Sequence, residues 1–73
     1  MRVRLDDVQH AESFAGFMQR CRCLVFDQGA GVCDVFLAVD LPQRLAQAEL
    51  EAYLSMWEQM TPGGHATLIP EVS

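Results

Sequence analysis

The stretch from Cys23 to Val39, CLVFDQGAGVCDVFLAV, most limits what this chain can fold into. Two runs rich in β-branched and aromatic residues, Cys23–Phe26 and Val32–Val39, flank the polar, glycine-containing segment Asp27–Gly31. Strand-like runs joined by a short turn of this kind are typical of a β-hairpin. The chain therefore contains an antiparallel pair of strands, and the segments before and after it have to pack on that pair.

A helical pattern lies on each side of the hairpin. From about Val8 to Cys21, apolar residues recur at three- and four-residue spacings and form one stripe of a helix. A second stripe follows Asp40, a candidate N-cap, and ends near Thr61, before a Pro-Gly-Gly run that terminates helices. The sequence thus predicts two amphipathic helices, each with one face for a sheet.

A short strand-like segment lies at each end of the chain. Arg2–Leu5 alternates charged and apolar residues, the pattern of a half-buried strand, and His65–Ile69 gives the last strand. The order strand, helix, hairpin, helix, strand favours an α+β fold of the ferredoxin-like type. We expect a single domain over residues 1–73, a βαββαβ two-layer sandwich. Its four-stranded antiparallel sheet has the order 4-1-3-2, and both helices cover one face.

The register of the hairpin decides which strand residues face the helices. We expect the loop to be Gln28–Gly31, so that Phe26 pairs with Cys33 and Leu24 with Val35. A pairing shifted by one residue would exchange the two faces of one strand. In the expected register, the hairpin side chains that face away from the helices are Cys23, Val25, Asp34, Phe36 and Ala38.

Charge and composition exclude several partners. The net charge is −5, with ten acidic residues against five basic ones, whereas nucleic acids and anionic membranes bind basic surfaces. The apolar runs are far shorter than the ~20 residues that span a bilayer, and the N-terminus does not resemble a signal peptide. Three cysteines do not form a disulfide framework. We therefore expect a cytoplasmic protein, and the absence of Lys and Asn suggests a bacterial, GC-rich coding sequence.

The helix-free face of the sheet is the first candidate site. It combines charged and apolar side chains, and a mixed patch of this size favours a protein interface, most simply a homodimer with the sheets packed face to face. An RNA platform would need aromatics on both central strands, and only Phe36 is present. The candidate interface residues are Arg2, Arg4, Val25, Asp34, Phe36 and Ala38.

A second candidate follows from the expected topology. The end of the first strand, the start of the last strand and the hairpin turn meet at one end of the sheet. Imidazoles and carboxylates gathered there could bind a small ligand or a divalent metal, or perform acid–base chemistry near neutral pH. The plainer interpretation is that the aspartates cap a helix and shape a turn. The ligand-binding candidates are Asp6, Asp7, His10, Asp27 and His65.

The three cysteines do not support a metal site. Cys21 and Cys23 have C-x-C spacing rather than the C-x₂-C of zinc sites, and the expected register points Cys23 and Cys33 to opposite faces. The chain also lacks the glycine-rich loops that hold nucleotides. We assign no metal, no cofactor and no catalytic residue, and an enzyme is the less favoured interpretation. We expect a non-catalytic interaction or regulatory module, or else an accessory subunit of a larger hetero-complex.

Overall fold

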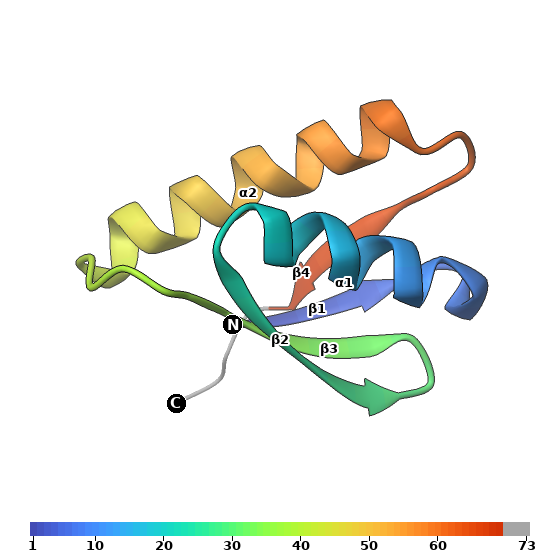
Figure 1. Cartoon of the computed structure of the whole chain (residues 1–73), viewed down its shortest axis with the longest axis horizontal. Helices are drawn as coiled ribbons and strands as arrows, with labels where there is room; N and C mark the ends of the chain where they lie inside the picture. The colour runs from blue at the N-terminus through green and yellow to red at the C-terminus, as the bar shows by residue number, and fades with distance from the viewer. Residues whose placement is uncertain (70–73) are drawn as a thin grey trace.

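The computed structural model describes residues 1–69 and has an α+β fold, in which two helices lie on one side of a four-stranded antiparallel sheet (Figure 1). A 3₁₀ turn, η1, leads into the first helix. Neither helix has both the length and the apolar character that a membrane-spanning segment needs, within the residues described. In chain order the elements are β1 (Arg2–Leu5), η1 (Val8–His10), α1 (Ala11–Arg20), β2 (Cys23–Gly29), β3 (Val32–Leu37), α2 (Gln43–Met60) and β4 (Ala66–Ile69).

The strands lie in the order β2-β3-β1-β4, which reads 4-1-3-2 from the β4 edge. All three pairings are antiparallel, and Val3 in β1 lies between Cys33 in β3 and Leu68 in β4. The ladder also extends to the first residue, because Val35 donates its N–H to the carbonyl of Met1 at 2.7 Å. The long hairpin thus contributes one edge strand and one central strand.

The hairpin register differs from the expected one by a single residue. The turn consists of Ala30 and Gly31 alone, both with positive φ, 54° and 79°, as in the two-residue type I′ turns that suit twisted hairpins. Gln28 is the extra residue of a bulge in β2, where the Asp27 carboxylate accepts a 2.7 Å hydrogen bond from the N–H of Gly29. The expected four-residue loop is therefore wrong: Val25, not Leu24, pairs with Val35.

This register reverses the faces of β2 alone. Cys23 is buried and Val25 packs against the core on the helix side, whereas Leu24 and Phe26 point to the helix-free face. The expectation that Val25 faces away from the helices is therefore wrong. Strands β1, β3 and β4 keep a regular alternation, and Thr67 and Ile69 lie on the helix-free face beside Arg4 and Arg2.

Both helices begin later than the sequence patterns predict. The segment Val8–His10 is a 3₁₀ turn capped by Asp7, whose carboxylate accepts a 2.9 Å hydrogen bond from Gln9 N–H. Helix α2 starts at Gln43 with Pro42 in the N-cap position, so the expected Asp40 cap is wrong. Proline presets the backbone angle at a helix start and has no N–H to leave unpaired, so the helix begins without a side-chain cap.

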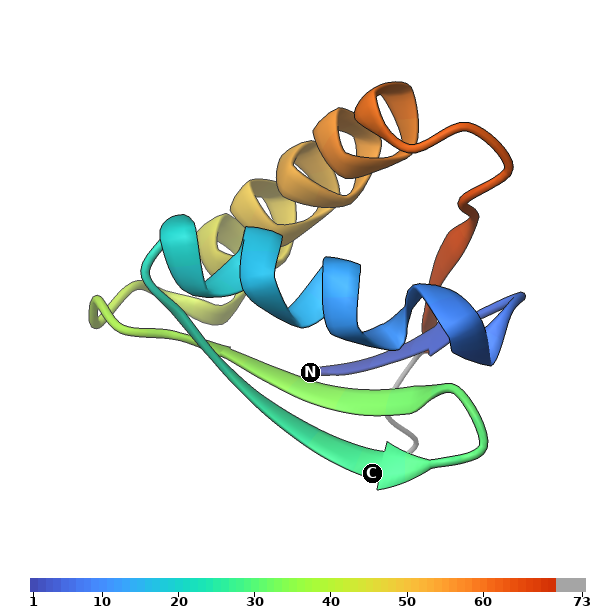
Figure 2. The same cartoon turned by 45° about the vertical axis from the view of Figure 1, so that its right-hand side comes forward.

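The core lies in the layer between the sheet and the two helices that Figure 2 shows from the side, and Trp57 is its largest fully buried side chain. The Trp57 ring meets Phe14 of α1 edge to face, with ring centroids 5.3 Å apart and an interplanar angle of 88°. Helix α1 packs mainly on β2, and α2 packs on β4. The buried residues are Val3, Leu5, Phe14, Phe17, Met18, Cys23, Cys33, Val35, Leu50, Leu54 and Trp57.

The turn offers a matched test of this structure. A Cβ added at Gly31 would lie 2.9 Å from the carbonyl oxygen of Leu5, whereas a Cβ at Gly29 would meet nothing within 4 Å, although both residues have positive φ. We therefore expect Gly29→Ala to lower the free energy of unfolding by about 1–2 kcal/mol, the cost of a left-handed non-glycine residue. Gly31→Ala should cost clearly more, because the β1–β3 contact also has to shift.

Urea unfolding of the two variants, followed by circular dichroism, measures this difference. Equal losses of stability would show that Gly31 does not approach Leu5 as described.

Candidate functional site

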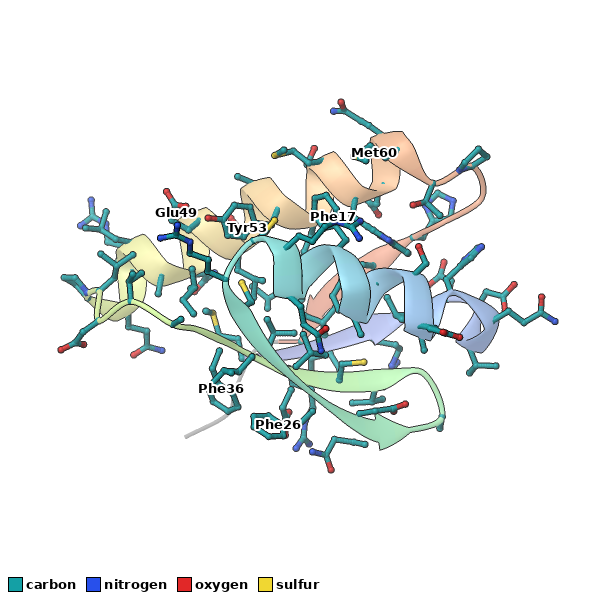
Figure 3. The ribbon with its side chains drawn as sticks, viewed as in Figure 1. Phe17, Phe26, Phe36, Glu49, Tyr53 and Met60 are labelled. Carbon is teal, nitrogen blue, oxygen red and sulfur yellow. The ribbon has the colours of Figure 1, made fainter. Side chains whose placement is uncertain are left out.

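The most prominent surface feature is an apolar cluster on the helix-free face, made of Leu24 and Phe26 in β2 and Phe36 in β3. We call these three residues the apolar patch. Their exposed fractions are 55%, 51% and 47%, large values for apolar side chains of this size on the face of a sheet. Figure 3 shows Phe26 and Phe36 side by side on the side of the sheet away from the helices.

The observed register brings the three side chains of the patch together. Leu24 pairs directly with Phe36, and Phe26 is the next residue of β2 on the same face. The Phe26 and Phe36 rings pack edge to face with centroids 5.9 Å apart. Such cross-strand aromatic pairs stabilise a sheet by about 0.2–1 kcal/mol, yet one side of each ring stays in water here. The patch is therefore ordered within the chain and still open to a partner.

Beside the patch, the same face is polar. The Arg2 guanidinium donates to Asp34 Oδ1 at 3.0 Å, and the amide of Gln28 donates to Asp34 Oδ2 at 3.0 Å. The hydrogen bond from Arg2 holds the pKa of the Asp34 carboxyl below its usual range. Arg4 and Thr67 continue this exposed polar surface toward β4. The face thus carries the apolar patch on β2 and β3 and, beside it, a polar surface that runs from Gln28 and Asp34 across Arg2 to Arg4 and Thr67.

The predicted interface residues are placed only partly as expected. Arg2, Arg4, Asp34 and Phe36 share the helix-free face through direct strand pairing. Ala38 is exposed just beyond the end of β3. Val25 is on the opposite face, whereas Leu24 and Phe26 lie on this surface, although the expected register placed them on the helix side.

The structure brings two of the candidate ligand-binding residues, Asp6 and His65, side by side through their backbones. Asp6 bonds through its backbone to His65, at 3.0 Å between Asp6 N and His65 O, which joins the end of β1 to the start of β4. The Asp7 and Asp27 carboxylates accept hydrogen bonds from nearby backbone N–H groups, so each shapes its own local turn. Within residues 1–69, no group of three or more His, Cys, Asp or Glu side chains could hold a metal ion.

The two histidines contact adjacent residues of α2, Trp57 and Glu58. The His10 ring packs against Trp57 with centroids 6.0 Å apart, and its Nδ1 is buried without a hydrogen-bond partner among the residues described. The His65 Nδ1 lies 3.8 Å from a carboxylate oxygen of Glu58, and both side chains are partly exposed. The imidazoles are thus used in packing and in a surface contact, and neither belongs to a metal-binding group of three or more side chains within residues 1–69.

The cysteines are part of the core. Cys23 and Cys33 are buried on the helix side, so the expectation that they point to opposite faces is wrong. They lie at different levels of the hairpin, because Cys23 pairs with Leu37 and Cys33 with Asp27, and all three cysteines are free. Burial raises the pKa of both thiols, so they stay protonated at neutral pH and are poor nucleophiles.

The polar network predicts a shifted titration of Asp34. Its carboxyl should titrate below the ordinary Asp range, and Arg2→Ala should raise that pKa because the main hydrogen bond is lost. Since the folded-state pKa is lowered, the stabilisation is present above the ordinary pKa and is lost as the pH falls through the lowered value.

The pKa of Asp34 can be measured by NMR titration of its carboxyl carbon. Arg4→Ala is the control, because Arg4 lies on the same strand and face but pairs with Val32 rather than Asp34. An unshifted pKa in the parent, or the same shift in both variants, would contradict the network.

Comparison with known proteins finds no matching family model, no matching curated protein and no matching solved structure. A proposal for the function of this chain therefore has to rest on the geometry of the helix-free face.

Proposed function

We propose that this chain is a small non-catalytic interaction module that self-associates through the apolar patch. The observation that carries the proposal is the exposure of Leu24, Phe26 and Phe36 in one contiguous cluster on a face that no helix covers. Contiguous exposed apolar patches rimmed by polar residues mark interaction sites in soluble proteins. Here the rim is the Arg2–Asp34 pair and its neighbour Gln28.

The size of the chain supports a second copy as the partner. A domain of this length buries only about 60% of the surface that its unfolded chain exposes, so its own core leaves little margin of stability. Burying one exposed Phe or Leu side chain contributes about 1.5–3 kcal/mol. A two-fold contact would use the same patch on both copies and so double the apolar area removed from water.

The polar surface beside the patch is compatible with such a contact. Arg2 and Asp34 neutralise each other within one chain, so an interface beside them does not have to bury an unpaired charge. The order of the elements and the strand order together support a ferredoxin-like assignment for the fold, whose sheet leaves one face without helices. This fold hosts many functions, and the proposal rests on the patch rather than on the fold.

Replacing Phe36 with Asp tests the proposal. We expect Phe36→Asp to weaken self-association at least about tenfold, because it puts a charge into the apolar contact. The side chain is half exposed in the monomer, so the variant should remain folded. Sedimentation equilibrium over a range of concentrations gives the dissociation constant, and circular dichroism confirms the fold.

Met60→Asp is the matched control. Met60 is also exposed and apolar, but it lies at the end of α2, on the other side of the molecule from the patch (Figure 3). Its variant should associate like the parent. A parent that is monomeric at every concentration would reject self-association, and equal weakening by both variants would reject the patch as the contact. A hetero-complex would then be the remaining use of this face.

A further inference from the structure

The outer edge of β2 is open. Among residues 1–69 it is the last strand on its side of the sheet, with β3 as its one strand neighbour (Figure 2). An edge strand presents a row of backbone N–H and C=O groups to solvent, and such a row is a template for another strand. Two of the three patch residues, Leu24 and Phe26, belong to this strand. The patch and the open edge are therefore parts of one surface.

The hydrogen bonds of the central strands identify which β2 residues present their backbone outward. Val35 donates to and accepts from Met1, at 2.7 and 2.8 Å, so both of its backbone groups point toward β1. In an antiparallel pair, when one residue points its N–H and C=O away from the partner strand, the residue opposite it does the same on its own side. Val25 is opposite Val35, and its N–H and C=O therefore point to the open edge.

A second hydrogen bond independently shows which residues of β2 bond to β3 and which point their backbone groups outward. Ala38 donates to the carbonyl of Arg22 at 3.0 Å, so the residue before the strand bonds toward β3. Residues two positions apart along a strand point the same way, so Leu24 and Phe26 bond to β3 as well. The residues that present their backbone outward are Cys23, Val25 and Asp27, with Val25 in the middle.

We propose that a second copy of this chain docks along β2, in antiparallel register, with Val25 opposite Val25 of the second copy. This inference rests on the proposed self-association and specifies its geometry: Leu24 and Phe26 of the patch meet the second copy, and Phe36 supports them from the neighbouring strand, where it pairs with Leu24. The two-fold axis passes beside Val25, and the outward backbone groups of Cys23 meet those of Asp27 of the second copy. The two sheets become one sheet of twice the width, and the edge is no longer open.

The side chains of β2 are complementary to themselves in this register. Leu24 lies opposite Phe26 of the second copy, and Phe26 lies opposite its Leu24. These are non-hydrogen-bonded pairs, in which the side chains come closest, with Cα atoms about 4.5 Å apart. Two patches that are separate in the monomers thus join into one apolar stripe across the two-fold axis.

The charges at the ends of β2 favour the antiparallel arrangement. Arg22 precedes the strand, and Asp27 lies near its other end; both side chains are exposed. Antiparallel pairing keeps the two Arg22 residues at opposite ends of the contact, and the two Asp27 residues likewise, whereas parallel pairing would place like charges side by side. On the helix side, a hollow beside β2 is lined by Ala11, Glu12 and Ala15 of α1 together with Val25 and Asp27.

Disulfide cross-linking tests the register directly. A cysteine at position 24 would lie opposite position 26 of the second copy, within the separation that a disulfide spans, whereas identical positions are about 7–8 Å apart on the diagonal. A mixture of Leu24→Cys and Phe26→Cys chains should therefore give several-fold more cross-linked dimer on mild oxidation than either variant alone. The parent, with its three free cysteines, gives the baseline. Equal yields in the mixture and in the single variants would overturn the register.

A Val25→Pro variant tests whether the dimer forms by pairing of the β2 edges or by some other contact. Proline removes the outward N–H at the centre of the contact, and its position in β2 is one that an edge strand tolerates. We expect at least tenfold weaker dimerisation in a monomer that stays folded, while Val25→Thr, which keeps the N–H, associates like the parent. A Val25→Pro dimer that forms normally, with Phe36→Asp still disruptive, would reject edge pairing and leave the proposed function standing. A parent that never associates would reject both.

Discussion

The rest of the structure depends on the tight turn at Ala30 and Gly31. Both residues have positive φ, and the Asp27 carboxylate bonds to the N–H of Gly29 just before them. Together, the turn and the bulge at Gln28 set the pairing of the hairpin to Val25 with Val35. One residue more or less in this turn would exchange the β2 side chains that face the helices with those that face away, because side chains alternate along a strand.

The core and the surface patch are two results of the same register. It places Cys23 and Val25 under α1, where they join Phe14 and the other apolar residues of the helix. The same register places Leu24 and Phe26 on the other face of the sheet, where the helices do not cover them. The two helices of residues 1–69 cover one side of the sheet, so the apolar side chains of Leu24 and Phe26 on the other side stay exposed. In the proposed dimer, these side chains, which are not part of the core, contact the second copy.

The sequence alone predicts most of the architecture and only part of the site. Periodic patterns are strong in Arg2–Leu5 and in both helices, and the elements form there with shifts of a few residues at their ends. In Cys23–Phe26 every residue is apolar, so no alternation shows which side chains face the core. The type of turn therefore determines which side chains of β2 face the core. The segment Gln28–Gly31 is compatible with more than one type of turn. Leu24 and Phe26 were missed for this reason, while the faces of β1 and β3 alternate clearly and were predicted correctly.

The most direct test of the account is amide hydrogen exchange at the residues of β2, measured by NMR at several protein concentrations. At low concentration, Leu24 and Phe26 should be protected by the ladder with β3, while Val25, whose N–H points outward, should exchange quickly. As the concentration rises through the dimer range, protection of Val25 should increase. Rapid exchange of Val25 in a sample that is fully dimeric would contradict edge pairing, and protection of Val25 in the monomer would contradict the register itself.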